Sequence, residues 1–270
     1  AGSTLVVNAA GSLTNDGGAL SSGGTQTVNV GALSNSNGQI VSGSVLNANV
    51  VGAVSNTGGT MQAAGALTAN AGSFDNTAGH IASLNADGLT LSTAGTLNNG
   101  AGGTGLGTIG GNGNVTVQAG QIANAGSITA VQNLTAAAAQ SLFSNGTLAA
   151  NGNVNASAGT TLANAGTFTA GQQAVISAAT VDNSGGSTSA NLLTLHATNL
   201  VNHGGTITQT GTGATTVDVS GTLDNTGGTL QTNAASLTLA PAVALVNDNG
   251  TIANAGTGAL TVSTGGFQAG

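Results

Sequence analysis

A short motif recurs along the chain and restricts its possible folds more than any other feature. The motif is an apolar residue, any residue, Asn, one to three residues ending in Gly, any residue and a second apolar residue. The Asn of successive copies stands at Asn15, Asn35, Asn56, Asn76, Asn99, Asn124, Asn145, Asn164, Asn183, Asn202, Asn225 and Asn247. Eleven steps cover 232 residues, a mean of about 21 per copy. A fixed period of this length indicates a protein built of stacked repeats.

Short runs of alternating apolar and polar residues lie between the motifs, as in Val115-Thr116-Val117 and Leu237-Thr238-Leu239. Alternation with a period of two is typical of a strand with one face inward, and β-branched residues favour strands. A repeat of about 21 residues holds two or three such strands. The sequence therefore predicts an all-β parallel β-helix (β-solenoid) of roughly 13 coils, forming a single domain over residues 1–270. At about 4.8 Å per coil, the stack would be roughly 60 Å long.

The motif also suggests a role for each of its residues. The apolar residues should point inward, while Asn should lie at a corner and bond the backbone or the next Asn of the stack. The motif Gly is expected to supply a positive φ at that corner. Longer steps near Asn99 and after Asn202 indicate loop insertions, of which Gly100 to Gly113 is the largest.

Composition supports a slender core and excludes several functions. Only four Phe are present, with no Trp or Tyr, so Ala, Val, Leu and Ile must fill the core. Lys and Arg are absent, which argues against binding to nucleic acid or to anionic membranes. Hydrophobic residues make up 39% of the chain and are regularly placed, which argues against disorder. The absence of Cys is compatible with export of an unfolded chain.

The repeats resemble those of filamentous haemagglutinins, the large exoproteins of bacterial two-partner secretion. The likeness lies in the L-x-N-x-G-G-x-I pattern that follows L-x-L or L-x-A strands, as at Leu193-Thr194-Leu195 leading to Leu200-Val201-Asn202. It extends from Leu13 to Ile252. The resemblance implies a right-handed parallel β-helix that is secreted or held at the bacterial surface, associated with the outer membrane.

The resemblance also implies a function and partners. We expect a stalk segment of a filamentous adhesin, a fragment of a longer filament, exported through an outer-membrane β-barrel transporter. Contact with a receptor or glycans on a host or neighbouring cell is the expected adhesive role. End-to-end self-association is a further expectation, because the chain has no Lys, the residue that commonly prevents sheet edges from pairing with another chain. A stretch from Ser21 to Val28 also looks like self-associating autotransporter passengers, which leaves the secretion route open.

We predict no catalytic, cofactor-binding or metal-binding residues, and no enzyme activity. His196 and His203 lie seven residues apart and could approach each other at a corner, but zinc needs about four ligands. Asp75, Asp182 and Asp224 each precede a motif Asn, where isolated Asp usually accepts hydrogen bonds from its own turn rather than binding calcium.

The alternative reading is a polysaccharide-active or carbohydrate-binding β-helix. Glycosidases need carboxylates gathered within about 5 to 10 Å, and only Asp218 and Asp224 come from one coil region. A flat hydroxyl face for ice or glycans would need Thr-x-Thr in register on successive coils. Thr206-Ile207-Thr208 is one such pair, but the sequence shows none that recurs in each coil.

Overall fold

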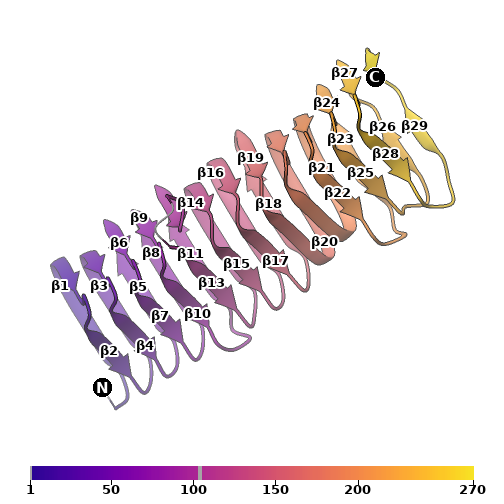
Figure 1. Cartoon of the computed structure of the whole chain (residues 1–270). Helices are drawn as coiled ribbons and strands as arrows, with labels where there is room; N and C mark the ends of the chain where they lie inside the picture. The colour runs from indigo at the N-terminus through magenta and orange to yellow at the C-terminus, as the bar shows by residue number, and fades with distance from the viewer. Residues whose placement is uncertain (1, 103–104) are drawn as a thin grey trace. The chain divides into compact units, whose positions relative to one another are not determined.

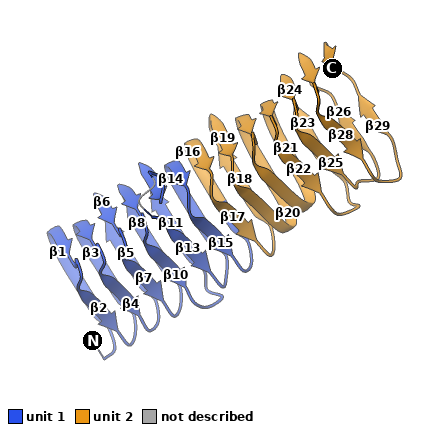
Figure 2. Cartoon of the chain, viewed as in Figure 1, with its two compact units in different colours: residues 1–135 blue, residues 136–270 orange. Residues whose placement is uncertain are grey.

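The computed structural model describes residues 2–102 and 105–270, and this part of the chain is all-β, with no helix. Parallel strands stack in about 13 coils, which makes the protein a β-solenoid, as the repeat period predicts (Figure 1). The chain divides into two compact units, residues 1–135 and 136–270 (Figure 2). The single-domain organisation stays a prediction, as does the right-handed sense of the coil.

The first unit contains short strands joined by tight turns. They are β1 (Leu5–Thr14), β2 (Ala19–Ser22), β3 (Gln26–Ser34), β4 (Gln39–Ser42), β5 (Leu46–Val50), β6 (Ala53–Ser55), β7 (Thr60–Ala63), β8 (Leu67–Ala71), β9 (Ser73–Asp75), β10 (His80–Ser83), β11 (Leu89–Thr93), β12 (Thr96–Asn99), β13 (Thr108–Gly111), β14 (Val115–Asn124) and β15 (Ser127–Ala130).

The second unit repeats the same plan with two longer strands, β20 and β21, that continue around corners. Its strands are β16 (Leu134–Ser144), β17 (Thr147–Ala150), β18 (Val154–Ala158), β19 (Thr161–Asn164), β20 (Thr167–Asp182), β21 (Ser187–Val201), β22 (Thr206–Gln209), β23 (Thr216–Val219), β24 (Thr222–Asp224), β25 (Thr229–Thr232), β26 (Leu237–Leu239), β27 (Ala244–Val246), β28 (Thr251–Asn254), β29 (Leu260–Val262) and β30 (Phe267–Gln268).

Each coil has three faces, which we name by their place relative to the Asn turn. Face 1 comes directly before the turn, face 2 directly after it, and face 3 completes the coil. Most strands pair in parallel with the equivalent strand of the next coil, as β4 does with β7 on face 2. A one-residue slip would expose the apolar set, so burial of that set specifies the register.

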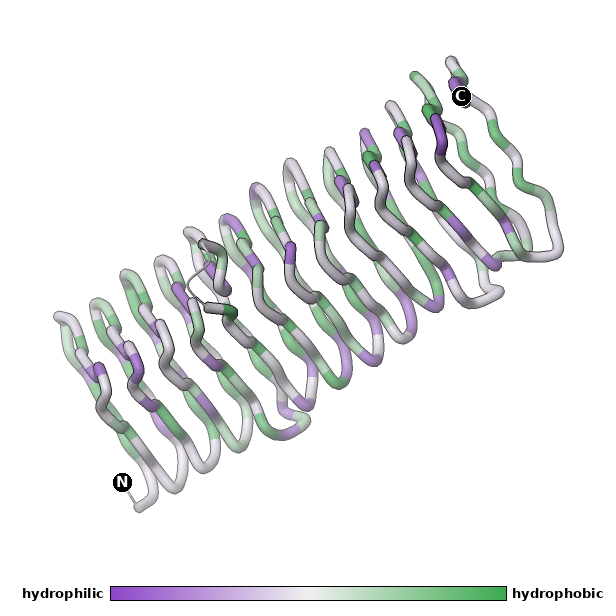
Figure 3. The backbone as a smooth tube through the Cα atoms, in the orientation of Figure 1, coloured by the Kyte–Doolittle hydropathy of each residue, from purple (hydrophilic) through white to green (hydrophobic). Residues whose placement is uncertain are grey.

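The core consists of apolar columns that run through each unit. On face 2 of the first unit, Ile40, Met61, Ile81, Ile109 and Ile128 stack in register, and each is fully buried. Apolar and polar residues alternate along the strands, so bands of both kinds succeed each other along the backbone (Figure 3). Inward residues of adjacent coils are therefore direct neighbours, and a narrow core of medium-sized side chains suffices.

The motif Asn residues form a buried column of hydrogen-bonded amides, which we call the asparagine ladder. In the first unit each Nδ2 donates to Oδ1 of the next Asn at 2.7 to 2.8 Å. This column contains Asn15, Asn35, Asn56, Asn76, Asn99 and Asn124. A second column in the other unit links Asn164, Asn183, Asn202, Asn225 and Asn247. The predicted contact between stacked Asn residues is confirmed.

The orientation of these amides follows from their backbone partners. Nδ2 of Asn35 also lies 3.3 Å from the carbonyl oxygen of Gly38 and 3.1 Å from that of Thr60. Both partners only accept hydrogen bonds, so the atom facing them must be the amide nitrogen. Each ladder therefore has a direction, donating from the earlier coil to the later one.

One predicted ladder position is wrong by a residue. Asn145 is exposed, and the buried position opposite Asn164 belongs to Ser144. Oδ1 of Asn164 is consequently buried without a hydrogen-bond partner. The motif pattern misplaced the ladder position because only two residues, Asn145 and Gly146, separate Ser144 from Thr147. Asn145 is therefore a turn residue, and Ser144 occupies the ladder position.

The explanation for the motif Gly also needs correction. The positive φ falls one residue earlier, at Gly58 before Gly59 and at Ala78 before Gly79, and non-Gly residues occupy that position in three turns. The motif Gly is instead required by close approach, since a Cβ at Gly59 would collide with the carbonyl oxygen of Asn35.

The predicted insertion from Gly100 to Gly113 is shorter than expected. Residues 108–111 form β13, which pairs in register with β10 and β15. Residues 103 and 104 of this segment lie outside the described residues. The sequence did not separate the strand from the loop because Gly110 and Gly111 continue the Gly-rich composition into β13.

Replacing Gln26 by Leu should stabilise the protein. Gln26 is fully buried on face 3, in register between Leu5 and Leu46, and neither atom of its amide has a hydrogen-bond partner. Leaving buried polar atoms unpaired costs about 1–3 kcal/mol. We expect the midpoint of urea or thermal unfolding of Gln26→Leu to rise.

Gln209→Leu is the matched control for that change. The buried Gln209 amide donates to the Gly211 and Gly213 carbonyls and accepts from the Leu193 N–H. This substitution should therefore destabilise the protein. Equal effects of the two substitutions would show that the unpaired amide of Gln26 carries no measurable cost.

Replacing Ser144 by Asn should extend the asparagine ladder of the second unit. The new Nδ2 would donate to the unpaired Oδ1 of Asn164, a gain of about 1 kcal/mol in the free energy of unfolding. Denaturant titration measures this gain. Ser83→Asn serves as the control, because it introduces the same amide at a buried Ser outside the ladder, where the hydroxyl donates to the Gly65 carbonyl. A loss of stability in Ser144→Asn would contradict the assignment.

Candidate functional site

The Asp residues that precede the motif Asn are held in their own turns. The Oδ1 atoms of Asp75, Asp182 and Asp224 each accept from the backbone N–H two residues later, at 2.9 to 3.1 Å. Each also accepts from the hydroxyl of that same residue, Thr77, Ser184 or Thr226. These Asp residues are therefore local acceptors that shape the turn, as predicted.

His196 and His203 do not approach each other as the sequence allowed; each pairs with an Asp of the next coil. His196 Nδ1 lies 3.3 Å from Asp218 Oδ2, and His203 Nε2 lies 2.8 Å from Asp224 Oδ2. Both His side chains are about half exposed, at 50% and 51%. Asp218 and Asp224, the one carboxylate pair from a single coil region, thus serve two separate inter-coil contacts.

The environment of Asp224 lowers its pKa from the ordinary value. Partial burial acts in the opposite direction and is the largest single effect, but it is outweighed by several favourable contacts. These are the hydrogen bonds from the Thr226 hydroxyl, from His203 and from the Thr226 N–H, together with the charge of His203. Asp16 also has a lowered pKa, because its carboxylate accepts from the Ser34 hydroxyl and the Ser36 N–H.

Hydroxyl groups form two columns on face 2 of the second unit. The first column places the following residues in register, one per coil: Thr147, Thr167, Ser187, Thr206, Thr229 and Thr251. Beside it, Thr169, Ser189 and Thr208 make a second column over three successive coils. The sequence expectation concerned Thr-x-Thr in every coil, whereas here pairs of Thr or Ser hydroxyls recur over three coils. The search for Thr-x-Thr missed the pattern because the middle coil uses Ser.

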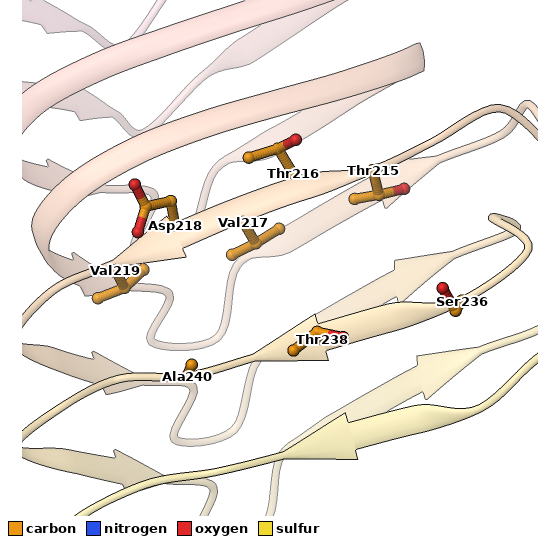
Figure 4. A pocket seen from close by; sticks show the side chains of 8 residues that line it. All are labelled: Thr215, Thr216, Val217, Asp218, Val219, Ser236, Thr238 and Ala240. Atoms are coloured by element: carbon orange, nitrogen blue, oxygen red, sulfur yellow. The ribbon is translucent and has the colours of Figure 1, made fainter.

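Face 3 of the second unit contains a hollow where the strand ladder is interrupted. Among the described strands, β23 pairs with β21, whereas β26 forms a separate two-stranded sheet with β29. A hollow of about 280 Å³ lies between β23 and β26. Figure 4 shows its lining, in which Thr216 and Asp218 project from β23 and Thr238 from β26.

The lining of this hollow is mainly hydroxylic, with one carboxylate. Thr215 and Ser236 complete the polar set, and Thr215 Oγ1 is buried without a hydrogen-bond partner. Asp218 also borders a second, broader hollow of about 440 Å³ that includes His196 and Ser177. Sequence reasoning missed this site, since the alternation in Leu237-Thr238-Leu239 looks the same whether or not the strand joins its neighbour.

Among the described residues, no group of three or more His, Cys, Asp or Glu side chains is placed to hold a metal ion. No helix there is long and apolar enough to cross a membrane.

The fold and its repeating turns define a parallel β-solenoid repeat protein. The family model of the haemagglutinin repeat matches residues 1–46, 27–101, 110–160, 133–191 and 176–227, which together cover most of the chain. The chain belongs to the haemagglutinin repeat family. Membership and fold together indicate a structural, adhesin-type protein that is secreted or located at the cell surface. No curated protein and no solved structure matches the chain.

The pair of Asp224 and His203 should make stability depend on pH. A carboxyl group with a lowered pKa in the folded state stabilises above its ordinary pKa of about 3.9. That contribution, under about 1 kcal/mol for a partly exposed pair, disappears as pH falls through the lowered value. Asp224→Asn should therefore lower the free energy of unfolding above about pH 4 and have less effect in stronger acid.

Asp182→Asn is the control that distinguishes the contribution of the turn hydrogen bonds from that of the ion pair. Asp182 accepts the same two hydrogen bonds within its turn, so the excess loss in Asp224→Asn reports the contact with His203. Urea titrations at several pH values measure both variants. Identical losses at every pH would refute the pH-dependent contribution.

Proposed function

We propose that this chain is a stalk segment of a filamentous bacterial adhesin, exported through an outer-membrane β-barrel transporter and held at the cell surface. The observation that carries the proposal is the asparagine ladder. Nearly every coil offers its Asn amide to the next coil with the same geometry, as Asn35 does to Asn56 and Asn56 to Asn76. A structure built of equivalent steps can be lengthened by adding coils, and extension is the property that a stalk requires.

The composition supports export of the chain in an unfolded form. With no Cys, the chain cannot form a disulfide before it crosses a narrow pore. With only 3% charged residues, little charge has to pass through that pore. The coils can then stack outside the cell one after another, because nearly all of their contacts are with the adjacent coil.

The direction of the ladder fits such sequential addition. When a coil has folded, the Nδ2 group of its Asn faces the side on which the next coil will stack. The next coil supplies the acceptors, namely its Asn Oδ1 and a strand carbonyl such as that of Thr60. If the earlier coils of an emerging chain fold first, their Asn Nδ2 groups are already in position to donate hydrogen bonds to the next coil.

Adhesion is the second part of the proposal. Receptors or glycans on a host or neighbouring cell would contact the polar outer faces, where the hydroxyl columns of face 2 offer both donors and acceptors. End-to-end association with another copy remains part of the proposal for the filament, because Lys, which commonly blocks strand edges, is absent.

Deletion of whole coils tests the stalk role. Removing residues 16–76 joins Asn15 to Thr77, which keeps the turn intact and deletes three coils. We expect the shortened repeat to stay folded, to be exported within the full-length protein, and to shorten the filament by about 14 Å at 4.8 Å per coil. Circular dichroism of the isolated segment and cryo-electron microscopy of the surface filament measure these outcomes.

The control is a deletion of residues 16–66, which leaves an incomplete coil and should unfold the neighbouring coils. Compact particles in place of filaments would contradict the stalk role. A whole-coil deletion that destabilises the chain as severely as the incomplete one would do the same.

A further inference from the structure

The hollow between β23 and β26 lies where this solenoid departs from its own repeat. On face 1 the ladder passes from β24 to β27, and on face 2 it passes from β25 to β28. On face 3 the corresponding step is absent, although the inward Val217, Val219, Leu237 and Leu239 are all buried. The core therefore continues through the coil, although β23 and β26 do not pair in a ladder.

We propose that this hollow binds one neutral sugar residue of a glycan, with Asp218 as the main acceptor. The inference gives a ligand class and a site to the adhesive part of the proposed function and rests on that part alone. The stalk role does not depend on this site. Microscopy of the filament therefore tests the stalk role, and a binding measurement tests the sugar site independently.

The first argument is the chemistry of the lining. A carboxylate has two oxygens that accept hydrogen bonds, so it can hold two adjacent hydroxyls of a sugar ring, and hydrogen bonds to charged groups are the stronger kind. The side chain of Asp218 is 68% exposed and is thus accessible. Thr216, Thr238 and Ser236 add hydroxyls that both donate and accept, which suits a ligand whose own groups do the same.

The second argument is that the site holds a polar group without a partner. Thr215 lines the hollow, and its Oγ1 is buried without a hydrogen-bond partner. A buried hydroxyl without a partner costs free energy that a hydroxylic ligand can restore. Strand edges that do not pair with each other lie on the same hollow and can bond sugar hydroxyls in place of the missing ladder.

The third argument concerns charge and size. The protein carries a net charge of -7 with no Lys or Arg, so it has no fixed cationic side chain to hold an anionic ligand. A hollow of about 280 Å³ lies just below the range of about 300–1,000 Å³ that is typical of pockets for drug-sized ligands. Together these properties select a small, neutral, polyhydroxylated ligand.

Titration of the full 270-residue chain with the methyl glycosides of mannose, galactose, glucose and N-acetylglucosamine tests the proposal. We expect saturable NMR shifts of backbone amides at residues 215–219 and 236–240 with at least one glycoside, at millimolar affinity. Asp218→Asn should weaken that binding about tenfold or more, and Thr238→Val should also weaken it. The absence of a saturable shift with all four probes would overturn the proposal.

Two control variants test whether binding depends on the residues of this hollow. Thr116→Val removes an outward hydroxyl from β14 on the same face of the other unit and should leave binding unchanged. His196→Asn removes the ion pair of Asp218 but keeps its carboxylate, and should also retain binding. Equal weakening in Thr116→Val and Thr238→Val, or shifts outside the two segments, would contradict a site at this hollow.

Discussion

A buried amide on the Asn of each turn is the group on which the stack depends. The side chain points into a narrow interior where an unpaired amide would be costly, and it cannot be satisfied within its own coil alone. Asn56 shows the solution: its Nδ2 bonds the Gly59 carbonyl of its own turn, and then Asn76 Oδ1 in the next coil. Local turn geometry and long-range stacking therefore share one side chain.

The same interaction accounts for the unusual requirements on neighbouring residues. Because successive turns must approach closely enough for amides to meet at 2.7 to 2.8 Å, a side chain at Gly59 would strike the carbonyl of the previous turn. The residue before it is less constrained, and Ala78 adopts a positive φ there. The narrow interior also favours medium-sized side chains, so the core consists mainly of Val, Leu, Ile and Ala columns, alongside the buried Phe74 and Phe168.

The repeat period made the fold and the inward residues predictable, since it reflects a constraint that acts in nearly every coil. Local departures from the period were harder to predict from the sequence. Ser144 replaces Asn at one ladder position, and a shift of one residue in a short turn disguised the change. The hydroxyl columns were overlooked because Ser187 and Ser189 interrupt a search for Thr while preserving the chemistry. The interruption between β23 and β26 has no signature in sequence, because it depends on how two corners position strands of ordinary pattern.

These departures matter because an even stack of coils has no unique place on its surface. Where every step is equivalent, a ligand finds many similar and weak sites, which suits extension and avidity but not recognition of one group. Specific recognition needs a local change in the backbone, and on face 3 the gap beside Asp218 provides one while the buried Val217 and Leu239 preserve the core. In a solenoid of this kind, the repeated contacts allow the stack to be extended, and the irregular coil offers a surface that can select one ligand.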